Sequence, residues 1–321
     1  MITPRVVLFL EEFDLSILKK LECEGFQPCA LSDFNGFDDD VIALCTKVTK
    51  PVPLLLSNRF KNLRYVITPA TGTDLVEKPS HHVSNFEIIS LRNNKNLLSQ
   101  FFSTREVFLW LLISLLRKAH RAAKDVEVNG LWERNLHLGT NIYGKTLGVL
   151  GFGRVGEQIA RVASALGMQV IAYDIEKKSN TIPGVTFVDS ARALVSQIDI
   201  LSINVDDRKE NDSLVNAELL KGARNLYIIN TSRGFVVEES AVVQGLRDKR
   251  ILGFGTDVLR GEGSEGNWLE LNPLWTLMTK EDSYNIVITP HIGGATIENI
   301  VKAERSVIDI FLSKIKGSSA R

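Results

Sequence analysis

The stretch from Lys145 to Asp174, KTLGVLGFGRVGEQIARVASALGMQVIAYD, sets the architecture expected for the whole chain. An apolar strand over residues 146–150 runs into a glycine-rich turn and then into a helix. The helix has apolar residues at the spacing of one buried face, namely Val155, Ile159, Val162, Ala163 and Leu166. Gly167 is the expected end of this helix, and a second strand over residues 169–173 follows it. This order predicts the unit from which a parallel α/β sheet is built.

The three glycines of the turn and the acid at its far end have separate physical roles. Gly151 permits the tight turn, Gly153 lets the backbone approach a pyrophosphate, and Gly156 lets the helix pack on the strand. The helix N-terminus offers N–H groups and partial positive charge to the phosphates. Asp174 would accept hydrogen bonds from the adenosine ribose and would repel a 2′-phosphate. A lone motif of this kind can be an ordinary turn, but the full order predicts dinucleotide binding, with NAD preferred over NADP.

Length and composition narrow the class of protein. A chain of 321 residues predicts two domains. Lys plus Arg number 38 and Asp plus Glu number 38, which argues against a nucleic-acid or membrane-surface partner. The longest apolar run, residues 107–116, is too short to span a bilayer, and the first residues lack the features of a signal peptide. Cys23, Cys29 and Cys45 lack metal-ligand spacing, so we expect reduced thiols, no metal and a cytoplasmic protein.

Predicted strands and helices alternate on both sides of the central stretch. Before it, strands are predicted over residues 5–10, 41–47, 63–67 and 86–91, and helices over 15–25 and 53–61. After it, strands are predicted over 185–188, 198–204, 225–230, 251–256 and 285–289, and helices over 190–195, 238–248 and 296–314. Such alternation indicates an α/β fold with two doubly wound parallel-sheet domains, whose last helix is long enough to pack on the first domain.

Two further segments have an expected place. Ser103 or Thr104 is predicted to cap a long helix that runs to about Val128 and links the two domains, possessing apolar residues nearly all round. The turn-rich loop over residues 68–74 follows a predicted strand. It is either an ordinary loop or a loop whose backbone N–H groups hold an anion, because ligands bind at the carboxyl ends of strands in such sheets.

Three polar residues follow predicted strands, and together they suit one reaction. They are Arg233 in NTSRG, Glu262 in TDVLRGE and His291 in TPHIGG. Each alone could be an ordinary surface residue. Histidine suits proton transfer because its pKa lies near 7, a carboxylate beside it raises that pKa, and an arginine can hold a substrate carboxylate by two parallel hydrogen bonds. Beside a nicotinamide, this set fits hydride transfer at a carbinol carbon.

The whole chain resembles the D-isomer-specific 2-hydroxyacid dehydrogenase family, which includes phosphoglycerate, glycerate, formate and D-lactate dehydrogenases. GFGRVG with Asp174, NTSRG, DVLRGE and TPHIGG occur in the family's order. The resemblance implies a Rossmann NAD-binding domain, residues 103–292, inserted in a flavodoxin-like substrate-binding domain, residues 1–102 and 293–321. It further implies an NAD-dependent oxidoreductase acting on a D-2-hydroxy acid or 2-keto acid, and a homodimer joined through the cofactor domains.

The resemblance also implies roles for individual residues. His291 would be the acid/base, Glu262 its partner and Arg233 the carboxylate clamp. The implied cofactor contacts are Gly151, Gly153, Arg154, Val155, Gly156, Asp174, Thr231, Ser232, Asp257, Gly293 and Gly294. Thr231 and Ser232 would lie near the nicotinamide, and Asp257 would meet its carboxamide. Ala70, Thr71 and Gly72 match the family's substrate loop, which favours the anion-binding interpretation of that segment.

The chain departs from the family pattern in three places. NVDDRKEND replaces the usual proline and threonines, so that Asp206 and Asp207 would lie near the adenosine pocket. The usual TAEH is Thr104-Arg105-Glu106-Val107, without the histidine. The chain ends soon after its last predicted helix, so the regulatory domain of many phosphoglycerate dehydrogenases is not expected. Two alternatives stay open: an NAD(H)-sensing interaction protein of the corepressor type with little turnover, and a pseudo-enzyme that does not bind NADH.

Overall fold

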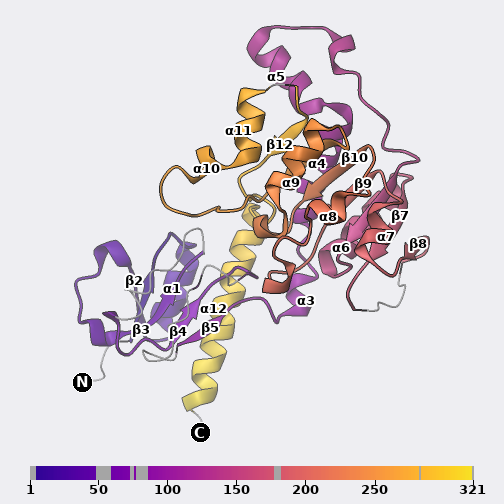
Figure 1. Cartoon of the computed structure of the whole chain (residues 1–321). Coiled ribbons are helices and arrows are strands. Elements are labelled where there is room, and N and C mark those ends of the chain that lie inside the picture. The colour runs from indigo at the N-terminus through magenta and orange to yellow at the C-terminus, as the bar shows by residue number, and fades with distance from the viewer. Residues whose placement is uncertain are drawn as a thin grey trace. The chain divides into compact units, whose positions relative to one another are not determined.

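The chain forms two compact units, each with its own parallel sheet (Figure 1). The computed structural model describes residues 5–47, 59–72, 76, 86–176, 182–281 and 283–319. Unit 1 comprises Met1–Phe101 and Ala295–Arg321, and unit 2 comprises Phe102–Gly294. The sequence predicted a division into 1–102 with 293–321 and 103–292. The α/β class with two doubly wound parallel sheets is confirmed.

Unit 1 has five strands in the order β2-β1-β3-β4-β5, the flavodoxin-like order. The strands are β1 Arg5–Phe9, β2 Phe26–Ala30, β3 Val41–Cys45, β4 Tyr65–Ile67 and β5 Glu87–Ile89. Within its described residues, the helices are α1 Leu15–Cys23, α3 Lys95–Leu98 and α12 Ile297–Ser319, with short 3-10 turns η1 Leu31–Asp33 and η2 Asp38–Asp40. Val307, Ile308 and Phe311 of α12 are buried in the core of unit 1, as the length of the last predicted helix suggested. Most of the helix predicted over residues 53–61 lies outside the described residues.

Unit 2 has seven strands in the order β12-β11-β10-β9-β6-β7-β8, which contains the Rossmann order. The strands are β6 Thr146–Leu150, β7 Gln169–Tyr173, β8 Val185–Phe187, β9 Ile200–Ile203, β10 Leu226–Asn230, β11 Ile251–Thr256 and β12 Ile286–Ile288. The helices are α4 Ser103–Arg117, α5 Ala119–Asn129, α6 Arg154–Ala165, α7 Ala191–Val195, α8 Ala217–Leu220, α9 Glu239–Arg247, α10 Trp268–Leu271 and α11 Pro273–Lys280. The described part of unit 2 also contains the 3-10 turns η3 Arg134–His137, η4 Lys209–Asn211 and η5 Gly234–Val236.

The predicted long helix is broken at Lys118, and this part of the prediction was wrong. Lys118 has φ +52° and separates α4 from α5. The Thr140 N–H donates to the Leu116 carbonyl at 2.8 Å, and a Cβ on Gly139 would lie 2.3 Å from that oxygen. The returning chain thus takes the carbonyl that a continuous helix would use. No helix among the described residues is long and apolar enough to cross a membrane.

The beginning of α4 and the buried face of α6 also differ from expectation. Ser103 and Thr104 do not cap α4, because their hydroxyls donate to the Gly293 carbonyl at 2.6 and 3.2 Å. On α6, Ile159 and Ala163 are buried as predicted, whereas Leu166 lies beyond the helix and is 39% exposed. The buried residues of α6 are Gly156, Gln158, Ile159, Ala160 and Ala163.

Candidate active site

The turn between β6 and α6 brings helix and strand close together and leaves the Gly153 position open. Gly151 has φ +90°, and a Cβ there would lie 2.8 Å from the Asn204 carbonyl. A Cβ on Gly156 would lie 2.2 Å from the Gly151 oxygen, so the close approach of helix and strand requires both glycines. At Gly153 no atom lies within 4 Å of the Cβ position, and no side chain caps α6. Open space before an uncapped helix start is what an anion needs.

Asp174 lies directly beside this turn. Its Oδ2 accepts the Phe152 N–H at 2.7 Å, and its Oδ1 accepts the Glu176 N–H at 2.9 Å. The end of β7 is therefore tied to the glycine-rich turn. The carboxylate is held where the sequence motif places the ribose partner, and each oxygen retains a second lone pair for a ribose hydroxyl.

Two arginines near the turn, Arg154 and Arg208, have shifted pKa values. Burial lowers the pKa of Arg154, the first residue of α6. The Arg208 guanidinium binds Asp206 as a fork, with Nε–Oδ1 at 2.7 Å and Nη2–Oδ2 at 2.6 Å. This hydrogen-bonded pair raises the pKa of Arg208. The negative charge that Asp206 brings to the NVDDRKEND segment is thus matched by a positive charge two residues away. Val155, the next residue of α6, is partly buried against the core.

The loop after β10 is folded by the Asn230 side chain. Its Oδ1 accepts the Ser232 N–H, and its Nδ2 donates to the Arg233 carbonyl, both at 3.0 Å. The Arg233 Nη1 donates to the Ser232 carbonyl at 2.9 Å. Among the described residues, the buried Thr231 Oγ1 and Asn204 Oδ1 are polar atoms without a hydrogen-bond partner. Both atoms belong to residues that directly follow β9 and β10, at the carboxyl ends of strands where ligands bind in such sheets.

His291 and Glu262 are in direct contact. The His291 Nδ1 lies 3.0 Å from the Glu262 Oε1, and the histidine side chain is 50% exposed. The hydrogen bond that His291 donates to Glu262 raises the pKa of His291, and the negative charges of Glu262 and Asp257 add to the rise. Burial and the positive charge of Arg233 oppose it. His291 has φ +54°, a strained conformation for a residue other than glycine. The structure thus brings the three predicted catalytic residues close enough for Glu262 and Arg233 to affect the pKa of His291.

Asp257 holds the loop that carries His291. Its Oδ1 accepts the Thr289 hydroxyl at 2.6 Å and the Ile292 N–H at 2.9 Å, and its Oδ2 accepts the Gly293 N–H at 2.7 Å. The His291 N–H donates to the Asp257 backbone carbonyl at 2.8 Å. Burial raises the pKa of Asp257, and the hydrogen bonds that its carboxylate accepts from Thr289, Ile292 and Gly293 oppose the rise. The protein itself therefore uses both carboxylate oxygens of this predicted cofactor contact. Gly294, which follows, has open space at its Cβ position.

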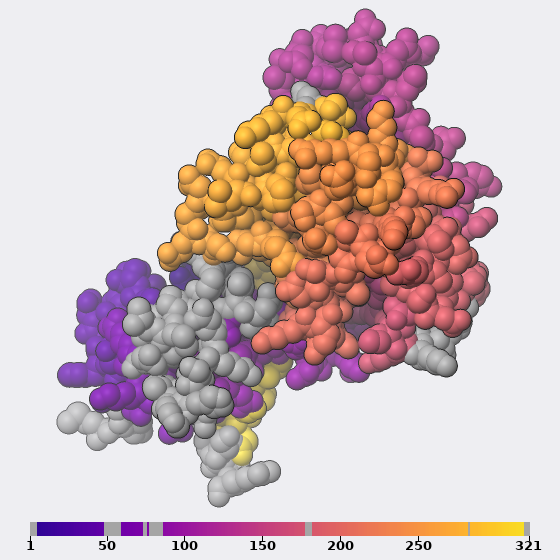
Figure 2. Space-filling view, viewed as in Figure 1, coloured from indigo at the N-terminus to yellow at the C-terminus, as the bar shows by residue number. Residues whose placement is uncertain are grey.

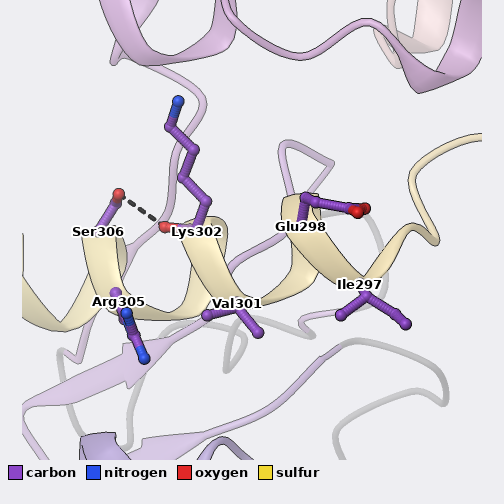
Figure 3. Close-up of a pocket in the computed structure, with 6 residues that line it drawn as sticks. All are labelled: Ile297, Glu298, Val301, Lys302, Arg305 and Ser306. Atoms are coloured by element: carbon purple, nitrogen blue, oxygen red, sulfur yellow. Dashed lines mark hydrogen bonds between the residues drawn. The ribbon is translucent and has the colours of Figure 1, made fainter.

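The predicted substrate loop lies in unit 1, directly after β4. The Ala70 N–H donates to the Thr68 Oγ1 at 3.1 Å, Thr71 is exposed and Gly72 is buried. Unit 1 also has a shallow groove of about 420 Å³ along α12 (Figure 3). The groove is lined by Ile297, Glu298, Val301, Lys302, Arg305 and Ser306. None of these belongs to the predicted site, and all come from one helix.

Sequence reasoning missed three residues whose side chains hold the segments that carry the predicted catalytic residues. Asn230 folds the Arg233 loop, Thr289 binds Asp257, and the buried Glu239 binds the turn before Glu262. Asn230 had a readable signal, since an asparagine at the end of a strand often folds the following turn. Glu239 had none, because its partners lie far away in the sequence.

Comparison with known proteins places these features in one family. The family model described as "D-isomer specific 2-hydroxyacid dehydrogenase, NAD binding domain" matches residues 109–293. A D-3-phosphoglycerate dehydrogenase of Synechocystis is 30% identical over 288 residues, which are 89% of this chain and 48% of that protein. A glycerate dehydrogenase of Methylorubrum extorquens is 30% identical over 265 residues, 80% of this chain and 77% of that protein. The chain thus spans about half the length of the phosphoglycerate dehydrogenase.

Solved structures support the same architecture. The crystal structure of D-lactate dehydrogenase from Aquifex aeolicus complexed with NAD and lactic acid has a TM-score of 0.77 to this chain, covering 97% of it and 96% of that enzyme. The two sequences are 20% identical, so this likeness speaks for the fold alone. The match of the family model to most of unit 2, with a relative that is 30% identical over 77% of its own length, shows that the chain belongs to the D-isomer specific 2-hydroxyacid dehydrogenase family.

Proposed function

We propose that the protein is an NAD-dependent oxidoreductase that interconverts a D-2-hydroxy acid and its 2-keto acid. The contact between His291 and Glu262, at the strand ends of a dinucleotide-binding sheet, is the observation that carries this proposal. Bound NAD would supply the hydride chemistry. Its diphosphate would lie over Gly153, Arg154 and Val155 at the start of α6, and its ribose hydroxyls would bind Asp174.

The residues of this chain would then move one proton and hold one anion. In keto-acid reduction, the His291 imidazolium donates its proton to the substrate oxygen, and in hydroxy-acid oxidation the neutral ring takes it back. Glu262 stabilises the imidazolium. Arg233 holds the substrate carboxylate, and the proposed anion-binding loop of unit 1 is Ala70, Thr71 and Gly72. Thr231 and Ser232 face the nicotinamide in this proposal.

The test of this function is NADH oxidation with a panel of 2-keto acids. The panel contains glyoxylate, hydroxypyruvate, phosphohydroxypyruvate and pyruvate, since relatives are named glyoxylate reductase, hydroxypyruvate reductase and phosphoglycerate dehydrogenase. We expect turnover with at least one of them. Binding of NADH without turnover of any 2-keto acid would favour the NAD-sensing alternative instead, and absence of NADH binding would favour a pseudo-enzyme.

The cofactor preference gives a separate prediction. NADH should bind more tightly than NADPH, because the Asp174 carboxylate beside the turn repels a 2′-phosphate. Asp174→Ala should narrow the difference by weakening NADH and relieving the repulsion of NADPH. Fluorescence titration measures the dissociation constants of NADH and NADPH for the wild type and for Asp174→Ala. The control is Glu218→Ala, which removes an exposed acid on α8. Equal constants in the wild type, or tighter NADPH, would show that Asp174 does not select the cofactor.

A homodimer joined through unit 2 is also proposed. Residues 119–143, here called the arm, expose several large apolar side chains, namely Val126, Val128, Trp132, Leu136, Leu138 and Tyr143. The arm stands out from the rest of unit 2 (Figure 2), and no residue of α5 is buried. Such a surface fits a protein interface. Light scattering should give twice the mass of the chain; a monomer at micromolar concentration would contradict the proposal.

A further inference from the structure

Glu239 is a buried carboxylate that the proposed mechanism does not use. It is the first residue of α9 and is 7% exposed. Its Oε1 accepts the Arg260 N–H at 2.8 Å, and its Oε2 accepts the Asn272 Nδ2–H at 2.6 Å. Burial raises the pKa of Glu239, and both hydrogen bonds oppose the rise. A buried acid with two fitted donors has a defined place, because leaving such a group or its partners unsatisfied is costly.

The donors identify what this carboxylate holds. Arg260 belongs to the turn Leu259–Glu262, closed by the Glu262 N–H donating to the Leu259 carbonyl at 3.2 Å. Gly261 in that turn has φ +85°. Glu239 therefore binds the backbone of the turn two residues before the side chain that contacts His291. Its other partner, Asn272, caps α11, which packs beside α9 in unit 2 (Figure 1).

The same turn is pressed against the loop that carries Arg233. A Cβ on Gly234 would lie 2.1 Å from the Leu259 carbonyl and 2.5 Å from the Arg260 nitrogen. The Arg260 guanidinium donates to the Asp212 Oδ1 at 2.9 Å and to the Phe235 carbonyl. The segment Arg233–Glu239 thus contacts the turn at two points. Gly234 packs closely against the turn, and Glu239 accepts a hydrogen bond from it.

We propose that Glu239 is a positioning residue that fixes the turn before Glu262 and so holds Glu262 against His291, a role that rests on the proposed function. Glu239 does not touch the reacting atoms. The charged groups that act on His291 are Glu262, Arg233 and Asp257. Glu262 is itself part of the turn, so loss of the tie should weaken the interaction that favours the imidazolium.

The hydrogen bond between Glu239 and Asn272 has a fixed donor and a fixed acceptor, and swapping these two roles tests the proposal. The Asn272 Oδ1 accepts the Leu274 and Trp275 N–H groups, which fixes its Nδ2 as the donor toward Glu239. In Glu239→Gln, one end of the new amide must oppose a donor, either the Arg260 N–H or the Asn272 Nδ2–H. In Glu239→Gln combined with Asn272→Asp, the glutamine accepts from Arg260 and donates to Asp, which still caps α11. The double variant restores every hydrogen bond, and only the one between residues 239 and 272 runs in the opposite direction.

The measurement is the pH dependence of kcat/KM for 2-keto-acid reduction with the substrate found active in the panel. Glu239→Gln should lower kcat/KM by roughly tenfold or more, since small displacements of catalytic groups have effects of this size. Its alkaline limb should move to lower pH, while the NADH dissociation constant stays unchanged. The double variant should return the limb to the wild-type position. Should Glu239→Gln fail to fold, Glu239→Asp, too short to reach both donors, should show the same displacement.

The control is Glu304→Gln in unit 1, a carboxylate 1% exposed that accepts the Asp14 N–H at 2.9 Å. It should lower the melting temperature without moving the limb. An unmoved limb in Glu239→Gln, or an equal displacement in the double variant, overturns the positioning role. Absence of any keto-acid reduction in the wild type would instead count against the proposed function, so the two failures are distinguishable.

Discussion

Arg233→Lys is expected to lose most of the activity although the charge is kept. The guanidinium can hold a carboxylate by two parallel hydrogen bonds, and an ammonium cannot form that fork. Loss of such a charge-assisted pair in a desolvated site costs about 2–5 kcal/mol, which is roughly a 30-fold to several-thousandfold fall in kcat/KM. Steady-state kinetics with the active 2-keto acid measure the fall.

The structure gives this prediction a matched control. Arg192 on α7 is also an arginine of unit 2, but it is 71% exposed and pairs with Glu218 at 2.6 Å. Arg192→Lys should leave kcat/KM unchanged, since an exposed ion pair contributes little. Unchanged kinetics in Arg233→Lys would mean that Arg233 is not the clamp, and a loss in both variants would point to a general effect of the exchange.

Much of the fold could be predicted because its determinants are local. The close approaches at Gly151 and Gly156 arise within the stretch 145–174 itself or at the neighbouring strand, so the glycine spacing reports them directly. The alternation of strands and helices gave the parallel sheets of both units. Arg233, Glu262 and His291 could be selected because each follows a strand at the edge where ligands bind.

The features that were missed depend on contacts between distant parts of the chain. The break at Lys118 requires the returning chain at Gly139 and Thr140. Strand β2 carries Pro28 and no apolar alternation, and it lies at the edge of its sheet, where a proline is tolerated. Glu239 reaches partners that lie 21 and 33 residues further along the chain.

The start of α11 at Asn272 could have been predicted from the sequence. An asparagine followed by a proline is a readable helix start, with Asn as the cap and Pro at the first helical position. The sequence analysis predicts no helix between residues 257 and 284, although α11 begins at this pair. This helix start matters for the site because Asn272, the cap of α11, is also the second hydrogen-bond partner of Glu239.

The pairing of Glu262 with His291 leads to the other large effect. His291→Ala should reduce kcat/KM on the order of a hundredfold or more, the usual contribution of a general acid or base. Glu262→Gln should act through the pKa of His291, which the hydrogen bond and charge of Glu262 raise. Keto-acid reduction needs the imidazolium, so wild-type activity should fall as the pH rises through that pKa.

Removal of the Glu262 charge lowers the histidine pKa, and both directions of the reaction should report it. The alkaline limb of reduction should move to lower pH, because the proton is lost earlier. Oxidation of the hydroxy acid needs the neutral ring, so its acidic limb should move to lower pH as well. Glu265→Gln, an exposed acid three residues further along the same segment, should leave both limbs in place. Limbs that stay fixed in Glu262→Gln, or move to higher pH, would exclude Glu262 as the partner, because removal of an attracting negative charge beside an imidazolium can only lower its pKa.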